Sequence, residues 1–183
     1  MNTYNAKEQL LDIKATFDSL GIPFWLREGT LLAAVRDGEF FDWDHDMDIS
    51  MLAWDWTPDI CSHFASFSCI PLKHALNRVT GFDLRRTSDV RTNVMLQFYN
   101  PEEDVYLTLS PPYGGAMRTA IPCDFLDTPN YIDFLGTEFR IPRYPEMVLQ
   151  SIYGDWHKLV KSGVPWRETW GEVGMGRYME GIV

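Results

Sequence analysis

The most constraining feature of the sequence is the strict alternation from Asp44 to Met51, with Asp44, Asp46, Asp48 and Ser50 on one side and His45, Met47, Ile49 and Met51 on the other. A period of two is typical of a β-strand with one polar face and one buried face. The polar positions include Asp44, Asp46 and Asp48, whereas apolar residues such as Met47 occupy the positions between them. We therefore expect a fold built around a sheet that gathers three carboxylates on one side.

The composition is that of a folded protein with enough residues for one domain. The chain has 183 residues, 45% hydrophobic, with 7 Trp, 8 Tyr and 11 Phe, which excludes disordered, collagen-like and coiled-coil classes. We see no linker or repeat and expect a single domain over residues 1–183, with a poorly periodic tail at about 161–183. The net charge of -10 argues against nucleic acid as a partner.

The cysteines and the absence of long apolar runs predict a cytoplasmic protein. Cys61, Cys69 and Cys123 are odd in number, lack paired metal-type spacing and lie in apolar stretches, so we expect reduced thiols in a reducing compartment. No apolar run approaches about 18 residues, so we expect no membrane span. The charged N-terminal segment also argues against a signal peptide.

Periodicity, caps and turn residues predict an α/β (α+β) fold with a short mixed β-sheet flanked by helices. The expected helices begin at a cap or a proline and end near a glycine: Asn5 to Leu20 with Asn5 and Glu8 as a capping box, Leu31 to Arg36, Thr57 to Phe67, and Glu146 to Tyr153. The expected strands are Pro23 to Glu28, Asp44 to Met51, Phe82 to Arg86, Asn93 to Tyr99, Val105 to Ser110, Ile121 to Leu126, and a hairpin from Tyr131 to Ile141.

The aspartate strand has the chemistry of a Mg²⁺ or Mn²⁺ site, since these ions prefer clustered oxygen ligands. At about 3.3 Å per residue, Asp46 and Asp48 lie about 6.6 Å apart and can reach two metals ~4 Å apart. Asp44 is about 13 Å from Asp48 on a straight strand, so it either bends back where the strand begins or acts behind the direct ligands. The alternative is a solvated acidic edge strand.

A Gly29-Thr30 pair stands where the first strand meets a helix. Backbone N–H groups at a helix N-terminus, together with a hydroxyl, can hold a phosphate. The alternative is an ordinary turn with Thr30 as the N-cap, and the acidic strand that follows soon after is what favours the phosphate site.

Four basic side chains and one further aspartate are secondary candidates. Arg36 either contacts a phosphate or complements the helix dipole. Arg85, Arg86 and Arg91 either clamp a pyrophosphate or form a solvated face. Asp124, on the expected strand, either completes the metal site and deprotonates an acceptor hydroxyl or is a hydrogen-bonded residue at a strand end.

Together these segments resemble the LicD family, which includes the fukutin and fukutin-related proteins. The resemblance rests on GTLLAAVR at 29–36 followed by DGEFFDWDHDMDI at 37–49. Further on, CDFL at 123–126, FLGTEFRIP at 134–142 and LQSIYGDW at 149–156 resemble later parts of the family pattern. The resemblance covers about residues 8–157.

The resemblance implies a nucleotidyltransferase-like fold and a transferase that depends on Mg²⁺ or Mn²⁺. It implies that Asp44, Asp46 and Asp48 bind the metal. The implied reaction moves phosphocholine or ribitol phosphate from a CDP-activated donor to a hydroxyl acceptor, a glycan or a small molecule. Alternatives are a nucleotidyltransferase acting on a small molecule and a catalytically silent nucleotide-binding domain.

For the site as a whole, we expect catalytic roles for Asp46, Asp48 and Asp124, and nucleotide contacts from Gly29, Thr30 and Arg36. The chain departs from the family pattern at three positions. Ala33 replaces a second glycine, Asp42 a proline, and His45 a further aspartate.

Overall fold

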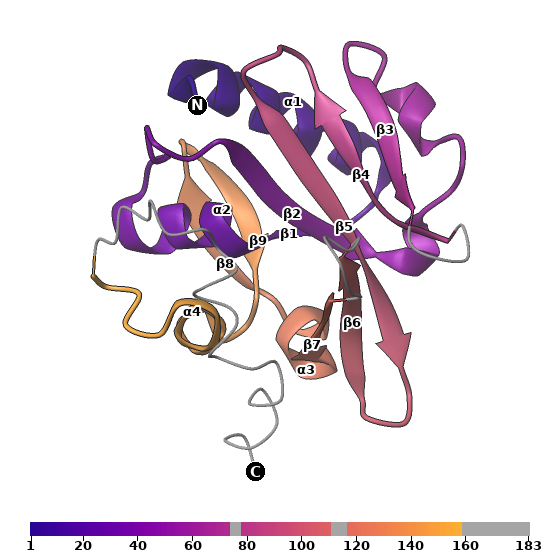
Figure 1. Cartoon of the computed structure of the whole chain (residues 1–183), viewed down its shortest axis with the longest axis vertical. Coiled ribbons are helices and arrows are strands. Elements are labelled where there is room, and N and C mark those ends of the chain that lie inside the picture. The colour runs from indigo at the N-terminus through magenta and orange to yellow at the C-terminus, as the bar shows by residue number, and fades with distance from the viewer. Residues whose placement is uncertain (74–77, 111–116, 159–183) are drawn as a thin grey trace.

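The computed structural model describes residues 1–73, 78–110 and 117–158. One mixed sheet runs through the molecule in the order β1-β2-β5-β4-β3, and β6 and β7 extend it from the far end of β5 (Figure 1). A separate hairpin, β8-β9, and the helices lie around this sheet. The predicted α/β class with a mixed sheet and flanking helices is confirmed. The expected tail at about 161–183 lies outside the described residues.

The elements have the following bounds. The strands are β1 (Phe24–Leu26), β2 (Asp46–Leu52), β3 (Ser68–Lys73), β4 (Val79–Arg85), β5 (Arg91–Asn100), β6 (Val105–Ser110), β7 (Met117–Pro122), β8 (Asn130–Phe134) and β9 (Thr137–Ile141). The helices are α1 (Thr3–Leu20), α2 (Glu28–Leu32), α3 (Cys123–Asp127) and α4 (Pro145–Tyr153), with a π-helical turn η1 (Ala33–Asp37) and 3₁₀ turns η2 (Ala53–Asp55) and η3 (Ile60–His63). Strands β2 and β5 are parallel, and the other pairs are antiparallel.

Helix α1 forms because Leu10, Ile13 and Phe17 recur on one side of it and are fully buried. Its N-cap is Asn2, whose side chain accepts the backbone N–H of Asn5 at 3.1 Å. The predicted capping box that begins at Asn5 is therefore wrong, because a cap-forming residue stands three positions earlier and adds a turn to the helix.

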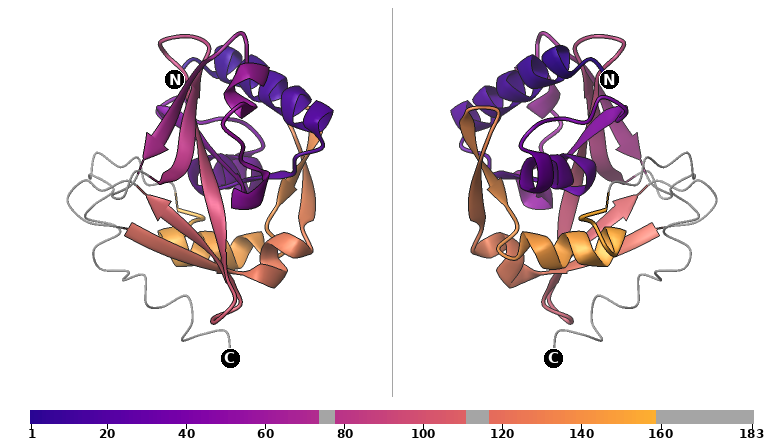
Figure 2. Two further views of the ribbon diagram at one scale, coloured as in Figure 1. Left: turned by 90° about the vertical axis from the view of Figure 1, so that its right-hand side faces the viewer. Right: turned by 90° about the vertical axis from the view of Figure 1, so that its left-hand side faces the viewer.

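The hydrophobic core lies between α1 and one face of the sheet (Figure 2). Met47, Ile49 and Met51 of β2 reach into it and are fully buried. On the opposite side of the sheet a smaller cluster joins Trp25 and Leu52 with side chains of β6 and α3. Strand β2 thus has one face in the main core, and its other face carries the polar groups.

Two expected elements differ from the structure. The segment after Thr57 forms a 3₁₀ turn rather than a long helix, because the Ser62 hydroxyl donates to the Asp59 carbonyl and the chain soon enters β3. The sequence pattern did not indicate β3. The expected strand from Ile121 to Leu126 stops at Pro122, which has no N–H to continue a ladder, and α3 begins at the next residue.

The cysteine prediction is corrected in part. Cys61 and Cys69 form a disulfide, with their Cα atoms 5.5 Å apart, because η3 and β3 bring these two positions within bridging distance. Cys123 is a free, buried thiol as expected. Disulfides persist in oxidising environments, so the prediction of a reducing compartment loses its basis. Across the described ranges, no helix is long and apolar enough to cross a membrane.

Candidate active site

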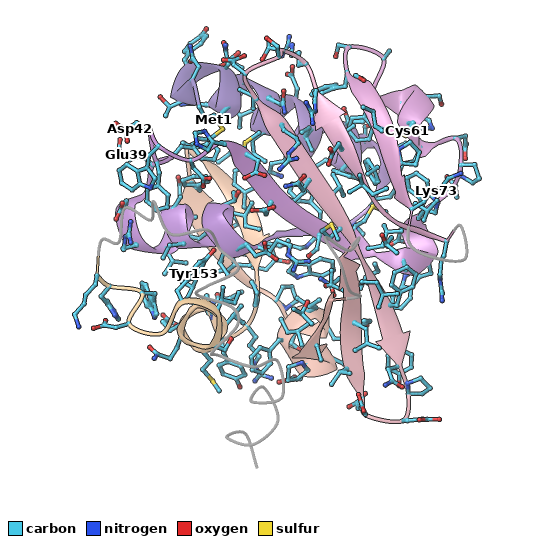
Figure 3. All side chains as sticks on the ribbon, viewed as in Figure 1. Met1, Glu39, Asp42, Cys61, Lys73 and Tyr153 are labelled. Carbon is cyan, nitrogen blue, oxygen red and sulfur yellow. A yellow bond between two sulfur atoms is a disulfide. The ribbon has the colours of Figure 1, made fainter. Side chains whose placement is uncertain are left out.

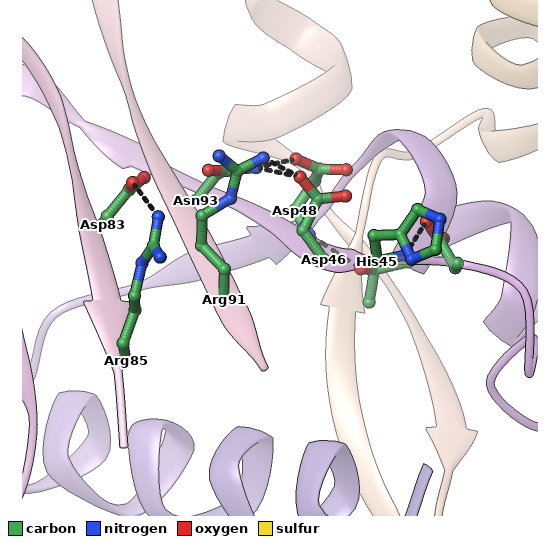
Figure 4. A network of polar contacts seen from close by, with 9 residues as sticks. His45, Asp46, Asp48, Asp83, Arg85, Arg91 and Asn93 are labelled. Carbon is green, nitrogen blue, oxygen red and sulfur yellow. Dashed lines mark hydrogen bonds and ion pairs between the residues drawn. The ribbon is translucent and has the colours of Figure 1, made fainter. Parts of the chain in front are cut away.

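Strand β2 places its aspartates on the face of the sheet that turns away from the α1 core. Asp46 and Asp48 are half-buried, whereas Met47 between them is fully buried. In the parallel neighbour β5, Arg91 is in register with Asp46 and Asn93 with Asp48. Figure 4 shows these four polar side chains gathered together. The prediction that Asp46 and Asp48 share one strand face is confirmed.

The amide of Asn93 joins the two carboxylates. Its Nδ2 donates to Asp46 Oδ2 and to Asp48 Oδ1, each at 3.0 Å (Figure 4). The Arg91 guanidinium also donates to Asp46 Oδ2 and forms an ion pair with it. Asp46 is therefore paired with the Arg91 cation, whereas Asp48 accepts a hydrogen bond from the neutral Asn93 amide.

Asp44 approaches the same place from the segment before β2. Its Oδ1 accepts the backbone N–H of His45 at 2.9 Å. A Cβ added at Gly29 would lie 2.8 Å from Asp44 Oδ2 and 3.9 Å from Asp48 Oδ2, so a side chain there would displace Asp44. This arrangement agrees with the alternative in which Asp44 bends back at the start of the strand.

Thr30 lies within α2, whose N-cap is Arg27 and not Thr30 as the alternative expected, and it fixes this helix against β2. The Thr30 hydroxyl oxygen accepts the backbone N–H of Asp48 at 2.8 Å, and the Arg27 N–H donates to the Asp48 carbonyl at 3.1 Å. Thr30 is buried, and Arg27 is anchored further by a 3.1 Å hydrogen bond to Thr108 Oγ1. Helix α2 and the aspartate strand are thus one hydrogen-bonded unit.

Glu28 and Tyr153 belong to this site but were missed by sequence reasoning. Glu28 has a φ of 46°, a left-handed conformation that is costly for a residue with a side chain, and its Oε1 accepts from Arg27 Nη2 at 2.5 Å. Tyr153 comes from α4, between that helix and α2 in Figure 3. Tyr153 is 39% exposed as a residue, but desolvation of its phenol, with the charges of Glu28, Asp48 and Asp44, raises the pKa of that group. The available signal for Glu28 was its position directly before the glycine turn.

The carboxylates of this site are poorly compensated. Burial, reinforced by the charges of Glu28 and Asp46, raises the pKa of Asp48 well above the ordinary carboxyl range, and the Asn93 hydrogen bond and Arg27 offset only part of that. Burial also raises the pKa of Asp44, although the backbone N–H of His45 opposes it. A bound cation would relieve this crowding.

The predicted metal ligands do not form a closed coordination shell. Within the described chain, no three Asp, Glu, His or Cys side chains are grouped closely enough to hold a metal ion. Asp46 bonds to Arg91 and Asn93, whereas Asp44 and Asp48 face Gly29. Mg²⁺ is commonly held by one or two carboxylates plus substrate phosphates, so Asp46 and Asp48 fit a shell that a phosphate ligand completes.

Arg36 is occupied elsewhere. It lies in η1, where its guanidinium bonds the carboxylate of Asp37, donates to the Trp156 carbonyl at 3.3 Å and covers the ring of Phe41. These contacts tie the helical turn to the end of the described chain. The structure does not bring Arg36 together with Gly29 and Thr30, and its predicted phosphate contact stays a prediction.

Asp124 is also apart from the aspartates of β2. It lies on α3, not on a strand, and both of its carboxylate oxygens are 2.7 Å from Arg143 Nη1. Its side chain is 54% exposed. A Pro122 that ends β7 was the signal in the sequence for this difference.

Comparisons with known proteins give relatives along most of the chain. The family model described as LicD/FKTN/FKRP, nucleotidyltransferase domain, matches residues 21–144. The chain is 31% identical to a ribitol-5-phosphate transferase FKTN of Mus musculus over 171 residues, and 31% identical to that of Homo sapiens over 160 residues. These matches cover 90% and 75% of this chain. The chain spans about a third of the length of these relatives, 35% and 34%.

Solved structures show the same fold at low sequence identity. The lincosamide antibiotic adenylyltransferase LnuA, lincomycin-bound, has a TM-score of 0.55 at 12% identity and covers 91% of this chain and 97% of its own. The antibiotic-resistance factor ANT(2'')-Ia has a TM-score of 0.54 at 14% identity, with 93% and 83% covered. The predicted nucleotidyltransferase-like fold is confirmed.

Proposed function

This chain belongs to the LicD family, and from that premise we propose that it is a transferase that depends on Mg²⁺ or Mn²⁺. It moves a phosphate-linked alcohol, of the ribitol phosphate or phosphocholine type, from a CDP-activated donor to a hydroxyl acceptor, preferably on a glycan. Ribitol phosphate is the first candidate because the matched relatives are named ribitol-5-phosphate transferases.

The observation that carries the proposal is the pair Asp46 and Asp48, joined by Asn93 and close to Gly29. Two adjacent carboxylates with incomplete charge compensation fit a divalent cation that shares its coordination with phosphates. Such a cation would neutralise charge on the donor phosphates. Asp46 and Asp48 would hold it, and Asp44 adds a third acidic group beside Gly29.

The protein's own part in this reaction is mainly positioning and electrostatics, as expected for phosphoryl-type transfer. Gly29 has no side chain and so lets the Asp44 carboxylate approach it closely, and the Thr30 hydroxyl holds Asp48 against α2. The acceptor hydroxyl oxygen forms a new bond to the phosphorus that bears the alcohol. The bond from that phosphorus to the CMP oxygen breaks, CMP leaves, and the hydroxyl proton is released.

Product analysis tests the proposal directly. The full chain is incubated with Mn²⁺, a hydroxyl acceptor and CDP-ribitol or CDP-choline, labelled in separate samples on the alcohol and on the cytidine. We expect CMP in solution and the alcohol label on the acceptor. Cytidine label on the acceptor would instead identify a nucleotidyltransferase, and nucleotide binding without turnover would identify a silent binding domain.

A variant pair links the activity to the site. Asp48→Asn keeps the shape of the side chain and removes its charge. Asp59→Asn makes the same change at an exposed residue next to η3. We expect transfer to be lost in the first variant and retained in the second.

A further inference from the structure

Arg91 is the charged neighbour of the site that the proposed reaction does not yet use. It begins β5, in register with Asp46, and its guanidinium forms an ion pair with Asp46 Oδ2. The Arg91 side chain is 40% exposed, so it is accessible from solvent as well as bound to the carboxylate. Arg91 is therefore already ion-paired with Asp46, one of the two carboxylates that would hold a metal.

A second acceptor lies on the other side of Arg91. Asp83 is on β4, paired in register with Asn93, and Figure 4 shows the Arg91 guanidinium between Asp83 and the β2 aspartates. The Asp83 side chain is only 10% exposed, and its Oδ1 is buried without a hydrogen-bond partner within the described residues. Its Oδ2 is 3.6 Å from Arg85, the length of a weak ion pair.

The charges around Asp83 show that Arg91 is near enough to act on it. Burial raises the pKa of Asp83, and the guanidinium groups of Arg91 and Arg85 work against that increase. A buried carboxylate oxygen without a donor is costly, so a guanidinium that moved toward Asp83 would gain a hydrogen bond there.

A divalent cation and Arg91 cannot both use Asp46 without repelling each other. Asp46 Oδ2 already accepts from Arg91 and from Asn93, so a metal that binds this oxygen displaces the guanidinium, and a metal that binds Oδ1 repels it. The guanidinium then has Asp83 on one side and, because the Arg91 side chain is 40% exposed, solvent on the other. Its planar set of donors fits phosphate oxygens.

We propose that Arg91 is an exchangeable counter-ion: it pairs with Asp46 while no metal is present, and it moves to Asp83 and the diphosphate of the nucleotide donor when a divalent cation takes Asp46. This proposal rests on the proposed function, since it concerns the same metal and donor. It gives Arg91 two roles, competition with the metal in the absence of nucleotide and support of nucleotide binding in the presence of metal.

Calorimetric titration with Mn²⁺ alone tests the first role. Arg91→Gln removes the competing charge, so we expect Mn²⁺ to bind ~2- to 5-fold more tightly than in the wild type. Arg86→Gln is the matched control, because Arg86 is 42% exposed and ion-paired with Asp12, away from Asp46. The control should bind Mn²⁺ like the wild type, and Arg91→Lys, which keeps the charge, should stay close to it.

Titration with CDP at saturating Mn²⁺ tests the second role. Loss of a charged hydrogen-bond donor to phosphate should weaken CDP binding ~10-fold in Arg91→Gln, with a partial loss in Arg91→Lys. Thermal melting confirms that each variant is folded.

The failures of the two proposals are distinguishable. If the wild type binds Mn²⁺ and CDP but Arg91→Gln binds Mn²⁺ no more tightly, or binds CDP equally well, the counter-ion proposal is overturned and the proposed function stands. If the wild type binds no Mn²⁺, either alone or together with CDP, both proposals are overturned.

Discussion

The two faces of β2, a strand of seven residues, have opposite effects on the stability of the protein. On one face Met47, Ile49 and Met51 are fully buried in the main core. On the other, Asp46 and Asp48 stand next to Arg91 and Asn93, with more negative charge nearby than these partners compensate. The apolar face therefore supplies stability, whereas the acidic face lowers the stability of the metal-free protein and forms the site.

The sharpest test of this division is Asp48→Asn. We expect transfer to fall by about three orders of magnitude, or ~4 kcal/mol of transition-state stabilisation, because the variant loses a charged metal ligand. CMP release from CDP-ribitol measures the loss, and far-UV circular dichroism shows that the fold is intact. A variant that keeps more than about a tenth of the wild-type rate would place the metal elsewhere.

Ile49→Ala tests the apolar face, where we expect a loss of stability without a loss of metal affinity. Truncating a fully buried Ile leaves a cavity and should lower the free energy of unfolding by about 2–5 kcal/mol. Urea denaturation measures this loss, and Mn²⁺ titration of the folded variant should give a wild-type affinity. An affinity that falls together with the stability would mean that the two faces are not independent.

The elements that the sequence predicted well are those fixed by local pattern. Strand β2 has its alternation, and α4 (Pro145–Tyr153) has a proline at its start and Gly154 after its end. Strand β3 could not be found this way, because Ser68 to Lys73 lacks a buried stripe and is stabilised by pairing with β4. The disulfide at Cys61 likewise depends on how η3 and β3 meet in space.

The residues of the site also divide into those indicated by local pattern and those brought together only by the fold. Asp46 and Asp48 are two residues apart on one strand, so their shared face could be read from the sequence. Their partners Arg91 and Asn93 are 45 residues away and meet them only through the parallel register of β2 and β5. The position of Glu28 depends on a left-handed backbone that no pattern of residues indicated.

Metal binding should offset the loss of folding stability caused by the acidic face. Mg²⁺ at a hundredfold excess over its dissociation constant should stabilise the wild type by about 2.7 kcal/mol and raise its melting temperature by several degrees. Differential scanning calorimetry with Mg²⁺ and with EDTA measures the shift. Asp48→Asn should lose it and Asp59→Asn should keep it; an equal shift in both would assign the ion to another place.

A smaller effect should appear in the metal-free protein as a function of pH. Because the folded-state pKa of Asp48 is raised, the folded protein holds a proton that the unfolded chain has lost at pH values between the ordinary carboxyl pKa and the raised one. The stability of the wild type in EDTA should therefore fall as pH rises through this window. Asp48→Asn lacks this titration, so its stability relative to wild type should increase as pH rises above the ordinary carboxyl pKa. A constant difference would show that Asp48 is already compensated.

The smallest effect is expected at Asp124, the aspartate that sequence spacing assigned to the acceptor hydroxyl. Its carboxylate pairs with Arg143 on the surface and is 54% exposed, so solvent screens the pair and its removal should cost at most about 1 kcal/mol. Asp124→Asn should also keep the wild-type rate of CMP release, because α3 does not bring this side chain to Asp46 and Asp48. A loss of activity at unchanged stability and Mn²⁺ affinity would instead support the catalytic role inferred from the sequence, and would require α3 to approach the acceptor during the reaction.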